Sequence, residues 1–154
     1  MLTDGKVLVL DNGLQARLMS IRDGYALQLA ASRGYRISIV SGADSMPVTQ
    51  RLNKLGITDV YMSVRDKAGF IRDYCSERSI TRKQVLFMGD DMPDLPVAGI
   101  AGLFCCPADA IDEIRAASDY VSPVDGGHGC VRDVIEKVLK ARGHWTGDPH
   151  VTSS

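Results

Sequence analysis

Short apolar runs alternate with helix-forming segments from Ser20 onward, and this alternation constrains the fold more than any other feature. Strands are predicted at residues 36–42, 59–64, 84–90, 103–109 and 119–124. Helices are predicted at residues 20–34, 44–56, 66–78, 92–102, 110–118 and 128–145. Strands separated by helices form parallel sheets covered on both faces. We therefore predict an α/β fold, a three-layer α/β/α Rossmann-like sandwich with a mostly parallel sheet and a ligand site beyond the carboxyl ends of its strands.

The stretch before Ser20 does not fit this alternation. The run "KVLVLDNG", residues 6–13, could be a buried strand that presents Asp11 as a nucleophile. It could also be the first arm of a β-hairpin over residues 5–19, because Asn12-Gly13 suits the two positive φ values of a type I′ turn. Neither arm is followed at once by a helix, so we favour the hairpin.

Length and composition limit the class of protein. The 154 residues suit a single domain, which we place at residues 1–143, followed by a polar tail at 144–154 that we expect to be flexible. The net charge of −1 gives no indication of a nucleic-acid partner. No apolar run approaches the ~20 residues that span a bilayer, and no signal peptide is visible, so we expect a cytoplasmic protein without a membrane partner. The four cysteines form no C-x-x-C pair, which indicates reduced thiols rather than a zinc site.

Two predicted strands end in residues suited to phosphate. Ser41-Gly42 closes the strand "ISIV", where a hydroxyl and freed backbone N–H groups can hold a phosphate oxygen. Lys67 follows the next strand and offers a compact positive charge for the same purpose. Each feature alone is common in turns and on protein surfaces. Only the order of these residues along the chain supports a phosphate-binding role.

A third predicted strand runs into an acidic turn, Gly89 to Asp94. Its sequence G-D-D-M-P-D places three carboxylates within five residues. Mg²⁺ prefers oxygen ligands and needs only one or two carboxylates when waters and a substrate phosphate complete its shell. We take Asp90 and Asp94 as metal ligands, with a solvated turn or helix cap as the alternative.

The ordered set of Ser41, Lys67 and the G-D-D-x-x-D turn resembles the haloacid dehalogenase superfamily of phosphohydrolases. The strings "TDG", "IRDGYALQLA", "LGITDVY", "MGDDMPDLPV" and "GGHGCVRDVIEKVL" look like one branch of it, the 3-deoxy-D-manno-octulosonate 8-phosphate phosphatases. The resemblance covers nearly the whole chain and implies the superfamily fold without a separate cap domain. It also implies Mg²⁺-dependent hydrolysis of a sugar acid phosphate in lipopolysaccharide precursor synthesis, with Ser41 and Lys67 as catalytic residues. Relatives that act on nine-carbon sugar acid phosphates share most of these strings.

The same resemblance locates the nucleophile outside the printed sequence. The family motif D-x-D-G-V-[LM]-T-D-G ends as "MLTDG" at residues 1–5, so both catalytic aspartates would fall before Met1. We expect a real enzyme whose sequence is shortened by a misassigned start or a truncation. A non-catalytic relative that binds a sugar phosphate or a partner, and a decaying gene product, are the alternatives.

By resemblance, further residues approach the substrate, and several subunits assemble. Arg22 could hold the sugar acid's carboxylate through a bidentate pair. The substrate-binding residues implied are Arg22, Gly24, Gly42, His128 and Arg132. His128 stands where the family often has arginine, which puts a charge-based contact in doubt at neutral pH. Capless relatives resemble one another in forming homotetramers in which the hairpin helps to cover a neighbour's site. Two functions remain, a phosphatase and a non-catalytic oligomeric binding protein.

Overall fold

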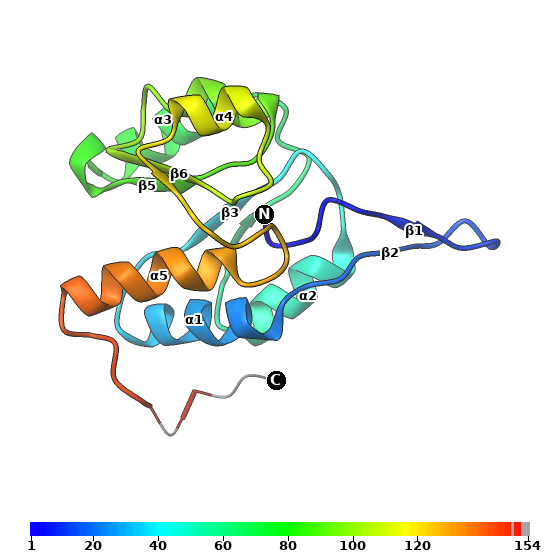
Figure 1. Ribbon diagram of the computed structural model, residues 1–154, viewed down its shortest axis with the longest axis horizontal. Coiled ribbons are helices and arrows are strands. Elements are labelled where there is room, and N and C mark those ends of the chain that lie inside the picture. Colours follow the sequence, from blue (N-terminus) through cyan, green and yellow to red (C-terminus); the bar gives the residue numbers. More distant parts are fainter. Residues whose placement is uncertain (149, 152–154) are drawn as a thin grey trace.

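The computed structural model describes residues 1–148, 150 and 151, and its elements follow the predicted alternation (Figure 1). The α-helices are α1 (Ile21–Ser32), α2 (Met46–Lys54), α3 (Lys67–Glu77), α4 (Asp112–Ala117) and α5 (Cys130–Ala141). The 3₁₀ helices are η1 (Arg82–Gln84) and η2 (Met92–Val97). The strands are β1 (Leu8–Val9), β2 (Gln15–Ala16), β3 (Ser38–Val40), β4 (Asp59–Tyr61), β5 (Leu86–Met88), β6 (Leu103–Cys106) and β7 (Tyr120–Val121).

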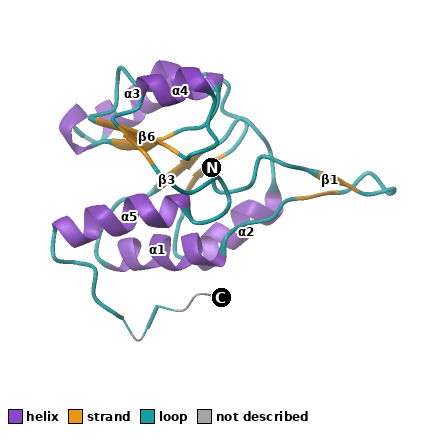
Figure 2. Ribbon diagram, in the orientation of Figure 1, coloured by secondary structure: helices purple, strands orange, loops and turns teal. Residues whose placement is uncertain are grey.

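The strands are mostly parallel, as predicted, and in the described part of the chain the parallel ones form two sheets. Strand β3 pairs with β4, and β6 pairs with β5 and β7, all in parallel (Figure 2). No described strand joins β3 to β5, so each sheet keeps an open edge. Met1 and Leu2 pack against the hydrophobic core cluster that both sheets share, and the N-terminus lies near the middle of the molecule (Figure 1).

Helices cover both faces of the strands, as the three-layer prediction requires. Helices α1 and α5 lie on one side, and α3 and α4 lie on the other (Figure 1). Cys105 of β6 is buried with the core on the α1 and α5 side, whereas Cys106 is buried with the core on the α3 and α4 side. Adjacent residues of a strand point to opposite faces, which accounts for this division. None of the four cysteines is in a disulfide.

Helix α5 is tied to strand β7 through one carboxylate, Asp133. Its Oδ2 accepts hydrogen bonds from Tyr120 Oη at 2.7 Å and from Ser122 Oγ at 2.9 Å, and its Oδ1 accepts one from Lys137 Nζ at 2.7 Å. Burial alone would raise the pKa of Asp133, but the hydrogen bonds from Lys137, Tyr120 and Ser122 together lower it. The charged carboxylate therefore stabilises the docking of α5.

Residues 7–18 form the predicted hairpin, with a different turn. Strands β1 and β2 are antiparallel, with Leu8 opposite Ala16. Only Gly13 of the turn has a positive φ, 79°, and its N–H donates to the Leu10 carbonyl at 2.8 Å. A β-turn followed by a left-handed glycine makes a three-residue loop, so the predicted type I′ turn is wrong. The apolar side chains of Leu8, Val9, Leu14 and Leu18 are 62–76% exposed.

Part of the segment that we expected to be a flexible tail contacts the domain. The Trp145 ring lies edge-on to Tyr25 with centroids 6.3 Å apart, and His144 Nδ1 hydrogen-bonds with Tyr35 Oη at 2.9 Å. Val151 is buried beside Leu29 of α1. Residues 149 and 152–154 of the tail prediction lie outside the described residues. Among the described helices, none has the length and apolar character needed to cross a membrane.

Candidate active site

The acidic turn after β5 folds around the side chain of Asp94. Asp94 is 3% exposed, and its Oδ2 accepts hydrogen bonds from the backbone N–H groups of Asp90 at 3.0 Å and Asp91 at 3.4 Å. A Cβ on Gly89 would lie 2.5 Å from the Cβ of Asp94, so the turn closes only because residue 89 is glycine. The buried carboxylate thus fixes the direction in which Asp90 leaves the sheet.

Lys67, at the start of α3, reaches the other oxygen of Asp94. Its Nζ donates to Asp94 Oδ1 at 2.5 Å, and the two side chains are 14% and 4% exposed. Asp66 caps α3 by accepting a hydrogen bond from the Gly69 N–H at 2.8 Å, which holds the first turn of the helix in place. The structure therefore brings together Lys67 and Asp94, which are 27 residues apart in the sequence.

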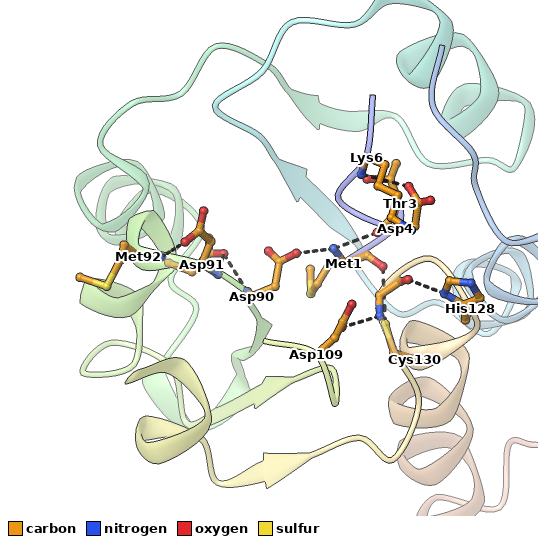
Figure 3. A network of polar contacts seen from close by, with 12 residues as sticks. Met1, Thr3, Asp4, Lys6, Asp90, Asp91, Met92, Asp109, His128 and Cys130 are labelled. Atoms are coloured by element: carbon orange, nitrogen blue, oxygen red, sulfur yellow. Dashed lines mark hydrogen bonds and ion pairs between the residues drawn. The ribbon is translucent and has the colours of Figure 1, made fainter. Parts of the chain in front are cut away.

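The Asp90 side chain points toward Met1 of the N-terminal segment (Figure 3). Its Oδ2 lies 2.6 Å from the ammonium group of Met1. The Asp90 side chain is 38% exposed, so its carboxylate lies on the open side of the turn. Of the two predicted metal ligands, only Asp90 has this orientation, because both oxygens of Asp94 already accept hydrogen bonds.

A glycine-rich loop before α5 (residues 126–129) packs directly on the N-terminal segment. The N–H of Gly127 donates to the Met1 carbonyl at 2.8 Å. A Cβ on Gly127 would lie 2.6 Å from the carbonyl carbon of Thr3 and closer still to the amide nitrogen of Asp4. Its φ of 72° also favours glycine. Residues 1–4 are therefore held beside Asp90 by close backbone packing.

Two residues of this packing were not predicted from the sequence. Asp109, after β6, accepts a hydrogen bond from the Gly126 N–H at its Oδ1, at 2.8 Å (Figure 3). The Cys130 thiol donates to the Met1 carbonyl at 3.5 Å. Burial raises the pKa of Cys130 to about 12, so the thiol keeps its proton at neutral pH. No motif identifies either residue, since an aspartate after a strand and a lone buried cysteine are both common.

Ser41 and Gly42 lie in a turn directly after β3. Ser41 Oγ accepts a hydrogen bond from the Ala43 N–H at 3.1 Å, and the backbone of Ser41 pairs with Tyr61 and Val64. Gly42 is exposed. No described contact joins this turn to Lys67, Asp90 or Asp94. The phosphate role of Ser41 and Gly42 stays a prediction.

A basic surface cavity adjoins the glycine-rich loop. It encloses about 560 Å³ and is lined by residues of α1, α5 and the loop: Arg22, Val124, His128, Gly129, Arg132, Asp133, Glu136, Lys137 and Lys140. The Arg132 Nε donates to Glu136 Oε2 at 3.3 Å, and its guanidinium lies 5.4 Å from the Trp145 ring centroid. His128 Nδ1 donates to the Gly126 carbonyl at 2.8 Å. Three of the predicted substrate-binding residues therefore share one cavity.

Gly24, which we predicted to bind the substrate, lies at a contact between two helices. It is buried, and a Cβ there would lie 3.3 Å from Arg51 Nη2 and 3.4 Å from Leu55 Cδ1. The glycine lets α1 approach α2, and its buried position offers no surface to a substrate. We therefore assign Gly24 to helix packing.

The donor atoms at the acidic turn suit Mg²⁺. Among the described residues, no group of three or more His, Cys, Asp or Glu side chains is arranged as a complete metal cage. Magnesium does not require one, because it keeps several waters and takes one or two carboxylates together with substrate oxygens. Asp90, whose partly exposed carboxylate lies on the open side of the turn, fits the protein share of such a site.

Comparison with known proteins gives the site a family context. The model for haloacid dehalogenase-like hydrolases matches residues 52–132. The 3-deoxy-D-manno-octulosonate 8-phosphate phosphatase of Escherichia coli is 32% identical over 142 residues, which cover 92% of this chain and 76% of that protein.

Solved structures agree with this result. The structure of the 3-deoxy-D-manno-octulosonate 8-phosphate phosphatase from Yersinia pestis superposes with a TM-score of 0.89 at 29% identity, over 93% of this chain and 77% of that one. The Moraxella catarrhalis phosphatase, solved with a magnesium ion, a phosphate ion and 3-deoxy-D-manno-octulosonate, superposes with a TM-score of 0.88 at 30% identity, over 92% and 81%.

Proposed function

The chain belongs to the haloacid dehalogenase-like hydrolase family, in its phosphatase branch, and we propose that its substrate is 3-deoxy-D-manno-octulosonate 8-phosphate. The products would be the free sugar acid and inorganic phosphate, a step in making lipopolysaccharide precursors. One observation supports this assignment most strongly. Lys67 and the turn from Gly89 to Asp94 meet beside residues 1–4, in a chain that matches phosphatases of this specificity over 92% of its length.

The proposed roles follow from the charges of the side chains. Lys67 balances negative charge on the transferring phosphoryl group, and Asp94 holds the lysine in position through its buried ion pair. Ser41 and Gly42 bind a phosphate oxygen through a hydroxyl and a backbone N–H. Asp90 would hold Mg²⁺, whereas the predicted role of Asp94 as a second ligand would require one of its oxygens to give up a hydrogen bond that it accepts here. When bound, the ion neutralises phosphate charge and orients the phosphoryl group.

The nucleophile is assigned to no residue among these 154. The sequence contains no D-x-D-G, and Asp11 lies in the exposed hairpin turn, so it is not a substitute. By resemblance, the two aspartates of that motif stand directly before residues 1–4. An aspartate there would attack phosphorus, and a second would act as general acid and base, so that one difficult displacement becomes two easier ones.

The basic cavity is the proposed site for the carboxylate end of the substrate. Arg22, which lines the cavity from the start of α1, can offer a bidentate pair. His128 and Arg132 line the same cavity. The exposed apolar hairpin fits a homotetramer in which this arm is covered by a neighbouring subunit, since isolated two-stranded hairpins are not stable in water. A cytoplasmic location remains a prediction.

The second candidate is a binding protein of the same fold without turnover, the alternative that the sequence left open. The two candidates are separated by assays on a protein in which the D-x-D-G strand precedes Met1. We expect that protein, with Mg²⁺, to release phosphate from the eight-carbon substrate faster than from nine-carbon sugar acid phosphates. Tight binding of the sugar acid phosphate without any phosphate release would support the second candidate. A preference for nine-carbon substrates would refute the proposed specificity.

A further inference from the structure

Helix α5 begins without a side-chain cap of its own. Its N-cap residue is Gly129, with a φ of 115°, and glycine has no side chain to accept a hydrogen bond from the first turn. The first N–H groups of a helix have no partner within the helix. Here the partner comes from another helix, because Asp23 of α1 accepts a hydrogen bond from the Arg132 N–H at its Oδ1, at 2.7 Å.

Asp23 is buried to an unusual degree for a carboxylate. It is 1% exposed, and its Oδ2 has no hydrogen-bond partner among the described residues. Burial raises the pKa of Asp23, while the backbone N–H groups at the start of α5 and the ammonium of Met1 oppose that shift. A buried carboxylate oxygen without a partner destabilises the fold, so its retention calls for a compensating role.

The start of α5 is connected by direct contacts to the acidic turn. Residues 126–129 precede the helix, and the Gly127 N–H donates to the Met1 carbonyl at 2.8 Å. The Met1 ammonium in turn lies 2.6 Å from Asp90 Oδ2. Figure 3 shows Met1 between Asp90 on one side and His128 and Cys130 on the other. Whatever fixes the start of α5 therefore also fixes residues 1–4, because the Gly127 Cβ position lies directly against the backbone of Thr3 and Asp4.

We propose that Asp23 is a positioning residue of the active site. By capping α5 from α1, it holds the glycine-rich loop at residues 126–129, and through that loop it holds residues 1–4 at a set distance from Asp90. The proposal rests on the proposed function in one respect: the D-x-D-G aspartates of the family would directly precede residues 1–4. Asp23 would then align the nucleophile with the metal ligand without touching the substrate.

Hydrogen exchange tests the structural half of the proposal without any substrate. The readout is the exchange rate of the Gly127 amide, with the Gly89 amide, bonded to the Cys105 carbonyl at 3.0 Å, as an internal reference. We expect Asp23→Ala to speed exchange at Gly127 by about tenfold relative to Gly89, the effect of losing one helix cap. Asp23→Asn keeps an acceptor oxygen and should stay within about twofold of the parent rate.

Two comparisons keep the exchange test decisive. Asp133→Asn weakens the hydrogen bonds that tie α5 to Tyr120 and Ser122, but it leaves the Asp23 carboxylate that accepts the Arg132 N–H, so it should raise exchange at both amides by similar factors. Where Asp23→Ala does not fold, Asp23→Ser replaces it, because its hydroxyl is too short to reach α5. Equal acceleration at Gly127 and Gly89 in the Asp23 variants would show a purely general stabilising role and overturn the proposal. The proposal is also overturned if Asp23→Asn behaves like Asp23→Ala.

Kinetics of the N-terminally extended protein test the catalytic half. Asp23→Ala should lower kcat by about tenfold or more with KM nearly unchanged, because misplacing a reacting group affects the chemical step rather than binding. Asp23→Asn should restore most of the rate. A kcat that stays at the parent value while Gly127 exchange accelerates would refute the positioning role. Failure of the proposed function is distinguishable, since then no variant releases phosphate although the exchange pattern persists.

Discussion

The packing of the glycine-rich loop on residues 1–4 makes Gly127→Ala a sensitive perturbation. The residue has a φ of 72°, and an added Cβ would overlap the backbone of Thr3 and Asp4. Gly143→Ala is a matched control, because Gly143 has a φ of 70° and no described atom lies within 4 Å of its Cβ position. Both changes place alanine in the left-handed region, which destabilises the protein by about 1 kcal/mol.

The magnitude expected at Gly127 is larger because backbone atoms cannot move aside as a flexible side chain can. Overpacking adds about 1–3 kcal/mol, so the total loss of unfolding free energy should be about 2–4 kcal/mol for Gly127→Ala against about 1 kcal/mol for Gly143→Ala. Urea unfolding followed by circular dichroism measures both. If the two variants agree within about 0.5 kcal/mol, residues 1–4 do not pack on the loop as described, and the proposed arrangement of the site is wrong.

Three further predictions concern single side chains. Asp133→Asn should lower the unfolding free energy at neutral pH by about 2 kcal/mol through loss of charge-assisted hydrogen bonds. The difference should vanish on acidification, because a lowered pKa gives stability that is lost as pH falls through it; a constant difference across urea titrations at several pH values contradicts this. Lys67→Met should lower the free energy of unfolding by about 3 kcal/mol, because it leaves the Asp94 carboxylate buried without its ion-pair partner. Adding Asp94→Asn should recover part of that loss. If thermal unfolding shows no recovery, the two residues are not coupled. Asp90→Ala should weaken Mg²⁺ binding about tenfold or more in calorimetry of the extended protein, and unchanged affinity would exclude Asp90 as a ligand.

Local sequence patterns predicted the elements well and their pairing less well. Apolar runs located β3 to β7, and Gly34 and Gly56 follow the ends of α1 and α2 with φ values of 82° and 80°. The turn of the hairpin was predicted wrongly because Asn12-Gly13 is compatible with more than one loop length. Strand pairing depends on contacts distant in sequence, so the two separate sheets could not be predicted from periodicity.

The charged residues of the candidate site that follow strands were predicted from the sequence. Residues whose role depends on how helices pack together were not. Lys67 and Asp94 were both selected from their positions after strands, and the structure brings them into one ion pair. Gly24 was taken for a binding residue, although the space it leaves serves helix packing. Asp23 was missed because its role depends on α5, which begins more than 100 residues later in the sequence. Its carboxylate accepts a hydrogen bond from an N–H group in the first turn of that helix.

Phosphate release from 3-deoxy-D-manno-octulosonate 8-phosphate tests the central claim most directly. Two proteins should be compared with Mg²⁺ at neutral pH: residues 1–154 alone, and the same residues preceded by the D-x-D-G strand. We predict steady turnover by the extended protein, abolished by replacing the first aspartate of the motif with asparagine, and no turnover by residues 1–154. Equal turnover by both proteins would contradict the placement of the nucleophile, and no turnover by either would contradict the proposed phosphatase activity.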